Sequence, residues 1–162
     1  RNIIMAKKFG TFKTIDELNR AAAAQKEEGD LEALRILAEE NGLSMEDVED
    51  YLDSEGNFVT PAMAAIGKLA LEEAEIRSEE IVKDWVEYIR YLCWDDSAFC
   101  EKVFSPEKTL KECVAAIMKW SFEHAYEVDK SVCKAAGVTT QVKMGIPGMR
   151  TAKRLIKEYY ER

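Results

Sequence analysis

The chain has 162 residues, of which 47% are hydrophobic and 33% charged, and its formal net charge is −8. Its length suits one ordinary domain or two very small ones, and no apolar run approaches the about 20 residues that a membrane helix needs. The first residues, RNIIMAKKFG, contain no apolar stretch long enough for a secretory signal, and Met5 is a candidate second start. We therefore expect a cytoplasmic protein with no membrane partner.

Charge is distributed unevenly along the chain. Residues 27 to 56 hold twelve carboxylates and a single base, Arg35, whereas residues 130 to 162 hold eight bases and two carboxylates. The net charges of these segments are −11 and +6. An acidic block repels nucleic acid and attracts basic protein grooves, and a basic helical end can do the reverse. The distribution favours a binding protein.

The N-terminal third is predicted to begin with a segment and two helices. We expect residues 1 to 13 to lack regular structure, and they are a candidate for disorder. A capping box at Thr14 predicts the first helix, which stops near Gly29. Asp30 can cap a second helix, and Gly42 lies at its C-terminal stop.

Further start signals continue the helical pattern. Ser44 with an acid three residues on predicts a short third helix. Thr60 followed by Pro61 is the clearest start in the chain, because a cap precedes proline at the first helical position. Ser78, with Glu80, is expected to start the next helix.

The C-terminal half is also predicted to be helical. A short helix through Phe99 and a long helix after Ser105 are followed by a short helix capped by Asp129. Residues 138 to 144 are rich in β-branched side chains and could be extended. A last helix covers roughly residues 149 to 160. The sequence thus predicts an all-α fold of about eight or nine helices.

We expect these helices to form a single compact domain over residues 14 to 162, with an acidic N-terminal part and a basic C-terminal helix. The aromatic residues between Trp85 and Phe99, which include Tyr88, Tyr91 and Trp94, are expected from their spacing to lie mostly in the core. Trp94, beside two aspartates, is a candidate rim residue that could anchor a partner.

The third predicted helix, MEDVEDYLD, carries five acids and no base. The turn before it, from Ala38 to Ser44, has helix-turn-helix spacing, but a helix that reads DNA needs Lys or Arg toward the phosphates. A helical hairpin with a solvated acidic face is the favoured interpretation, and an acidic docking surface that imitates a phosphate row is the alternative. The candidate partner-binding residues are Glu46, Asp47, Glu49, Asp50 and Asp53.

The last helix, GMRTAKRLIKEYY, is amphipathic, with one apolar and one basic face. Cations near a helix C-terminus oppose the macrodipole, so a solvated face is favoured. The functional alternative is contact with a nucleic-acid backbone or an acidic partner. The candidate nucleic-acid-binding residues are Lys143, Arg150, Lys153, Arg154 and Lys157.

No catalytic or metal-binding constellation is visible in the sequence. His124 is the sole histidine, and Cys113 precedes it by eleven residues, which is about 16 Å along a helix and too far for a thiolate–imidazole pair. The four cysteines are scattered and are interpreted as reduced core residues. We therefore expect no enzymatic activity, no metal and no cofactor.

Five phrases together carry a resemblance: MAKKFGTFKTIDELNRAAAAQKEEGD, LAEENGLSMEDVEDYLD, AAIGKLALEE, KDWVEYI and GIPGMRTAKRLIKEYY. In this order they resemble a family of small proteins carried by phages and mobile elements of gut anaerobes. That family includes a type II-A anti-CRISPR protein, which inhibits an RNA-guided effector nuclease.

The resemblance implies a non-enzymatic inhibitor, acting in the bacterial host cell, that binds the nuclease with its guide RNA, as a homodimer, and blocks DNA binding or cleavage. The alternative is an accessory or regulatory protein of a mobile element, which makes a weak DNA or RNA contact through its basic end.

Overall fold

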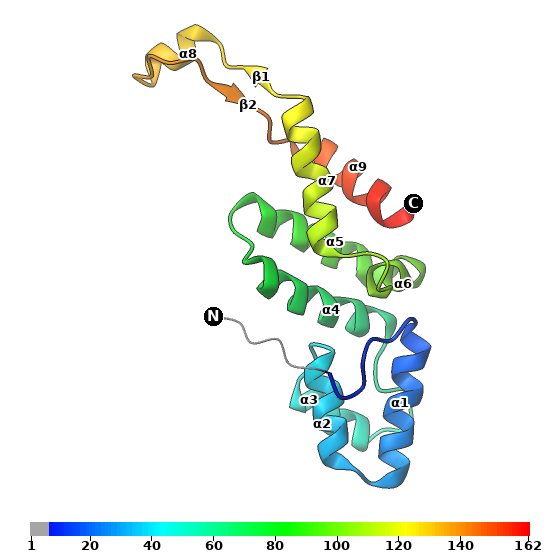
Figure 1. Cartoon of the computed structure of the whole chain (residues 1–162). Coiled ribbons are helices and arrows are strands. Elements are labelled where there is room, and N and C mark those ends of the chain that lie inside the picture. Colours follow the sequence, from blue (N-terminus) through cyan, green and yellow to red (C-terminus); the bar gives the residue numbers. More distant parts are fainter. Residues whose placement is uncertain (1–6) are drawn as a thin grey trace. The chain divides into compact units, whose positions relative to one another are not determined.

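The computed structural model describes residues 7–162 and is helical almost throughout (Figure 1). The prediction of an all-α fold is confirmed, and the described residues contain nine helices and one two-stranded sheet. The chain divides into two compact units, of which unit 1 ends at Leu110 and unit 2 runs from Lys111 to Arg162. No helix in residues 7–162 combines the length and the apolar character needed to cross a membrane.

Unit 1 contains six helices and the first residue of a seventh. In chain order they are α1 (Ile15–Glu28), α2 (Leu31–Glu40), α3 (Met45–Leu52), α4 (Pro61–Ile76), α5 (Ile81–Asp95), α6 (Ser97–Phe104) and the start of α7 (Leu110–Glu123). Helix α2 packs between α1 and α3, and α4 packs against both α5 and α6. Most of the buried aliphatic side chains of the protein lie in these helices.

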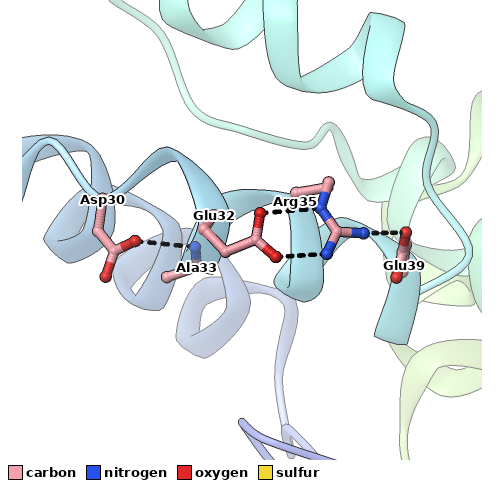
Figure 2. A network of polar contacts seen from close by, with 5 residues as sticks. All are labelled: Asp30, Glu32, Ala33, Arg35 and Glu39. Carbon is pink, nitrogen blue, oxygen red and sulfur yellow. Dashed lines mark hydrogen bonds and ion pairs between the residues drawn. The ribbon is translucent and has the colours of Figure 1, made fainter.

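Several helices of unit 1 begin where the sequence predicts. The Thr14 hydroxyl accepts a hydrogen bond from the Glu17 amide at 3.2 Å, and Asp30 accepts one from the Ala33 amide at 3.0 Å (Figure 2). The Thr60 hydroxyl caps α4 immediately before its proline. Each of these side chains satisfies an amide that has no partner inside its helix.

The predicted cap of α5 at Ser78 is wrong. Helix α5 begins after Glu80, which has a φ of 47° and makes no side-chain cap. The Ser78 hydroxyl instead donates a hydrogen bond to the Glu73 carboxylate at 2.6 Å. A half-buried carboxylate on α4 thus binds the hydroxyl that the sequence assigns to α5.

The segment before α1 contacts α2 where the structure describes it. The amides of Lys8 and Phe9 donate to the Glu40 carboxylate at 2.5 and 3.1 Å. A side chain at the end of α2 thus holds this segment, and the expectation of disorder stays a prediction. Residues 1–6, and with them the candidate start at Met5, lie outside the described residues.

Two sets of contacts join α4 to other segments of unit 1. A Cβ on Gly42 would lie 2.1 Å from the Gly67 carbonyl oxygen, so the turn after α2 meets α4 backbone to backbone. At the next residue of α4, the Lys68 ammonium donates to the carbonyl oxygens of Val103, Ser105 and Lys108 at 2.7, 3.0 and 2.6 Å. These carbonyls lie in the last turn of α6 and along the connection to α7, so one lysine holds that connection against α4.

Unit 2 consists of the rest of α7, an arm and a terminal helix. The arm, residues 126–144, contains β1 (Tyr126–Glu127), α8 (Lys130–Ala135) and β2 (Lys143–Met144), and α9 (Met149–Glu161) follows it (Figure 1). Tyr126 pairs with Met144 in an antiparallel register. Residues 143–144 are thus the only part of the predicted extended segment that is a strand within the described chain.

Candidate binding surfaces

The acidic surface on α3 consists of four exposed carboxylates. Glu46, Glu49, Asp50 and Asp53 are exposed, as the sequence predicts. The fifth candidate, Asp47, is half-buried and forms a capping box, because its carboxylate accepts from the Ser44 amide at 2.8 Å. This second role separates Asp47 from the other four.

The α3 acids form like-charge pairs along their helix, and the helix dipole favours only those of the first turn. Glu46 and Asp50, and likewise Glu49 and Asp53, are one turn apart, and such like-charge pairs destabilise a helix by about 0.2–0.5 kcal/mol each. Asp53 also lies at the C-terminus of α3, where the helix dipole disfavours an anion. Neither the fold nor a cap requires these four charges.

Lys26 partly compensates for this arrangement from α1. Its ammonium donates to the carbonyl oxygens of Tyr51 and Ser54 at 2.9 and 2.6 Å and lies 4.4 Å from the centre of the Tyr51 ring. A cation therefore satisfies the C-terminal carbonyls of α3 while the carboxylates stay in solvent. The sequence does not reveal this contact, because nothing in the local pattern places Lys26 beside α3.

The one base of the acidic segment is neutralised within its own helix. Arg35 pairs with both Glu32 and Glu39 on α2, and Figure 2 shows its guanidinium between the two carboxylates. The hydrogen bond and charge of Glu32 raise the pKa of Arg35 further above its usual range, and the same hydrogen bond lowers the pKa of Glu32. Arg35 therefore offers no unpaired positive charge to a partner.

Helix α9 presents the predicted basic face. Arg150, Lys153, Arg154 and Lys157 are exposed, and the opposite face is buried through Ala152, Ile156, Tyr159 and Tyr160. The guanidinium of Arg154 pairs with the Glu158 carboxylate at 2.9 Å. The four bases share one face because their spacing of three and four residues follows the helical repeat.

Lys143 lies on another element. It is exposed on β2, where it is the register partner of Glu127 on β1. Opposite charges at facing positions of two strands stabilise the pairing, so Lys143 has a local role in the arm. The structure places Lys143 in unit 2 with the α9 bases but not on their helix face.

The two units carry charges of opposite sign. The sequence assigns −12 to residues 1–110 and +4 to residues 111–162. The predicted charge asymmetry therefore follows the structural division of the chain.

His124 and the cysteines lie apart. His124 is exposed, stacks on Trp120 with ring centres 4.2 Å apart, and has Nδ1 2.9 Å from the Trp120 carbonyl oxygen. Cys93, Cys100 and Cys113 are buried, and Cys133 is half-buried. Residues 7–162 contain no group of three or more His, Cys, Asp or Glu side chains that could hold a metal ion.

The aromatic residues of α5 and α6 divide between core and surface. Trp85 and Phe99 are buried as predicted, but Tyr91 and Trp94 are 68% and 66% exposed. The core assignment is wrong for Tyr91, whereas the exposed position of Trp94 agrees with the rim interpretation. The helical repeat explains the difference, because Tyr91 and Trp94 lie on the side of α5 opposite its core-facing residues.

Comparison of the chain with protein-family models, curated proteins and solved structures finds no match. The candidate surfaces are therefore interpreted from their own chemistry.

Proposed function

We propose that this protein is a non-enzymatic inhibitor that binds an RNA-guided type II effector nuclease together with its guide RNA and blocks DNA binding or cleavage. The observation that carries the proposal is the set of four exposed α3 carboxylates, which no cap or fold contact uses, in a unit of charge −12. Such nucleases hold nucleic acid in strongly positive channels and read a short DNA motif with arginines. The sequence resemblance points to the same class of target.

The acidic face would compete with DNA for basic groups. Carboxylates at successive turns of α3 repeat about every 5.4 Å and can each accept two hydrogen bonds from a guanidinium. In the proposed complex, Glu46, Asp50 and their neighbours on α3 occupy positions that phosphates take in the DNA complex. Binding then excludes DNA without any bond being made or broken.

The test is a charge reversal that spares Asp47. We expect a variant with Lys at positions Glu46, Glu49, Asp50 and Asp53 to bind and inhibit a purified guide-loaded type II nuclease at least tenfold less well than the parent. A matched control reverses four other exposed acids of unit 1: Glu27, Glu28, Glu55 and Glu79. The control should lose a few-fold at most.

Both variants must first show the parent's circular dichroism spectrum. Equal inhibition by the α3 variant and the parent would exclude the acidic face as the contact. Failure of the parent to bind any of a panel of guide-loaded type II nucleases would sink the proposal itself. The homodimer that the resemblance implies stays a prediction, which light scattering of the purified protein checks.

A second candidate function is an accessory protein of a mobile element that contacts DNA or RNA through α9. The exposed bases of α9 in a unit of charge +4 favour it. We expect a variant with Gln at Arg150, Lys153, Arg154 and Lys157 to weaken nucleic-acid binding and to flatten its salt dependence by roughly one phosphate for each lost contact. Fluorescence anisotropy with labelled DNA and RNA at several salt concentrations measures this, and an unchanged slope would exclude α9.

A further inference from the structure

Helix α5 presents two faces of different chemistry. Its buried residues, Trp85, Val86, Ile89 and Cys93, recur at the helical repeat and face the core of unit 1. A helix turns by about 100° per residue, so the opposite side is an arc of about 120°. Six side chains share this arc, and we call them the α5 stripe: Asp84, Glu87, Tyr88, Tyr91, Trp94 and Asp95.

The aromatic half of the α5 stripe is continuous. Tyr88, Tyr91 and Trp94 follow one another at intervals of three residues, and the rings of Tyr88 and Tyr91 stack with centres 6.4 Å apart and planes 20° apart. Tyr91 and Trp94 are about two-thirds exposed. Single exposed apolar residues are common on any protein, but adjacent Tyr and Trp side chains are typical of the centre of a protein interface.

The acidic half of the α5 stripe flanks these rings. Glu87 pairs with Arg90, whose other contact is the Glu73 carboxylate of α4 at 2.7 Å. Asp84 and Asp95 are exposed and have no ion-pair partner in the part of the chain that the structure describes. The stripe thus offers flat rings between unneutralised carboxylates.

The combination of aromatic rings and carboxylates favours some ligands of the α5 stripe over others. A nucleic acid could stack on the rings, but its phosphates would be repelled by Asp84 and Asp95 within a unit of charge −12. A guanidinium satisfies both halves, because its plane stacks on an aromatic face while its N–H groups donate to a carboxylate. An ammonium forms the ion pair but cannot stack in the same way.

We propose that the α5 stripe binds an arginine-bearing segment of a protein partner. The guanidinium stacks on Trp94 or Tyr91, and its N–H groups donate to Asp95 or Asp84. The inference deepens the proposed function, since guide-loaded nucleases present arginine-rich surfaces. Its binding test, however, needs no nuclease.

The first experiment measures peptide binding to the full-length protein. Two labelled eight-residue peptides, one with four arginines and four glycines and the other with lysine at every arginine position, are titrated and followed by fluorescence anisotropy. We expect the arginine peptide to bind at least fivefold more tightly. In the double variant Tyr91→Ala, Trp94→Ala this preference should fall to near one.

Matched variants separate the two halves of the α5 stripe. Asp84→Asn with Asp95→Asn should weaken both peptides, since it removes charge but leaves the rings. Phe122→Ala, which removes an exposed ring from unit 2, should leave both affinities unchanged. Equal affinity of the parent for the two peptides, or an undiminished preference in the double variant, overturns the proposal.

The same double variant is then tested against the guide-loaded nuclease. A loss of inhibition of tenfold or more supports the α5 stripe as a contact in the complex. An arginine preference in a protein that binds no such nuclease supports the stripe and overturns the proposed function. Full inhibition by the double variant, without any arginine preference in the parent, overturns the stripe and leaves the proposed function standing.

Discussion

Unit 1 and unit 2 differ in how completely they bury their apolar side chains. Eight of the thirteen large exposed hydrophobic residues in the described chain lie in unit 2, although it is the shorter unit. They include Phe122, which is 81% exposed, and Ile146, which is 64% exposed. In unit 1 the exposed large residues on α5 are accompanied by carboxylates, whereas the arm of unit 2 carries its apolar residues among lysines.

The two units are therefore expected to differ in what stabilises them. A unit of about 50 residues buries a smaller share of its surface than a larger unit does, and it is marginal on its own. Unit 1 has a larger core. It also has a close backbone contact between Gly42 and Gly67 and the hydrogen bonds of the Lys68 ammonium. We expect changes in unit 1 to act through close contacts, and changes in unit 2 to act through the junction of its arm with α7.

The largest effect is expected for Gly42→Ala. The new Cβ would meet the Gly67 carbonyl oxygen at 2.1 Å, and Gly42 has a φ of 72°. Strain and overpacking together should lower the free energy of unfolding of unit 1 by about 3–5 kcal/mol. Gly29→Ala is the matched control, because Gly29 has a φ of 69° but open space around it, and should cost about 1–2 kcal/mol. Urea denaturation measures both, and equal losses would contradict the close contact.

A smaller effect is expected for Lys68→Met, which keeps the apolar stem and removes the ammonium. Three carbonyl oxygens lose their donor, and we expect a loss of about 2–3 kcal/mol from unit 1. Lys102→Met, at an exposed position on α6, should change stability by less than about 0.5 kcal/mol. Hydrogen exchange should show faster exchange at residues 103–110 in the Lys68 variant alone. Unchanged exchange there would show that the lysine does not hold this connection.

In unit 2 the corresponding change is Gly145→Ala. Its Cβ would lie 2.3 Å from the Ser121 carbonyl oxygen, so the segment that follows β2 must move away from α7. We expect a loss of about 1–3 kcal/mol, confined by hydrogen exchange to α7 and the arm. Gly148→Ala meets no atom within 4 Å and should cost about 0.5 kcal/mol at its N-cap position. An equal rise in hydrogen exchange in unit 1 would contradict the division of the chain into two units.

The smallest effect is expected for the pH dependence of stability. Burial acts to raise the pKa of Glu73, but hydrogen bonds from Ser78 and Arg90 outweigh it, and the pKa is lowered. A carboxylate with a lowered pKa stabilises the fold above its ordinary pKa of 4.5, and this contribution is lost as the pH falls through the folded value. Between pH 7 and pH 3 the melting temperature of Glu73→Gln should therefore fall less than that of the parent. Glu79→Gln, at an exposed position nearby, should follow the parent.

Local chemistry explains what the sequence predicts well. The caps at Thr14, Asp30, Ser44 and Thr60 need only the next turn of the chain, and all four are confirmed. The exposed acids of α3 and bases of α9 were predicted because helical spacing alone places them on one face.

The features that the sequence did not predict depend on contacts between residues that are distant in the chain. Ser78 donates to Glu73 instead of capping α5, and Glu40 accepts from the amides of Lys8 and Phe9 at the end of α2. Lys26 and Lys68 hold carbonyls that lie 25 to 40 residues away in the chain. No local pattern specifies such partners, because they follow from how the helices pack.

The uneven burial of the cysteines makes the native chain selectively labelable. Burial raises the pKa of the Cys93 and Cys100 thiols, and the Cys100 Sγ donates to the Cys93 carbonyl oxygen at 2.9 Å. Thiols held in the neutral form react slowly with maleimides at neutral pH, whereas Cys133 in the arm is only half-buried. A fluorophore or spin label added to the unmodified sequence would thus attach first to the arm. Paired with a donor in unit 1, that label would report the distance between the two units in solution.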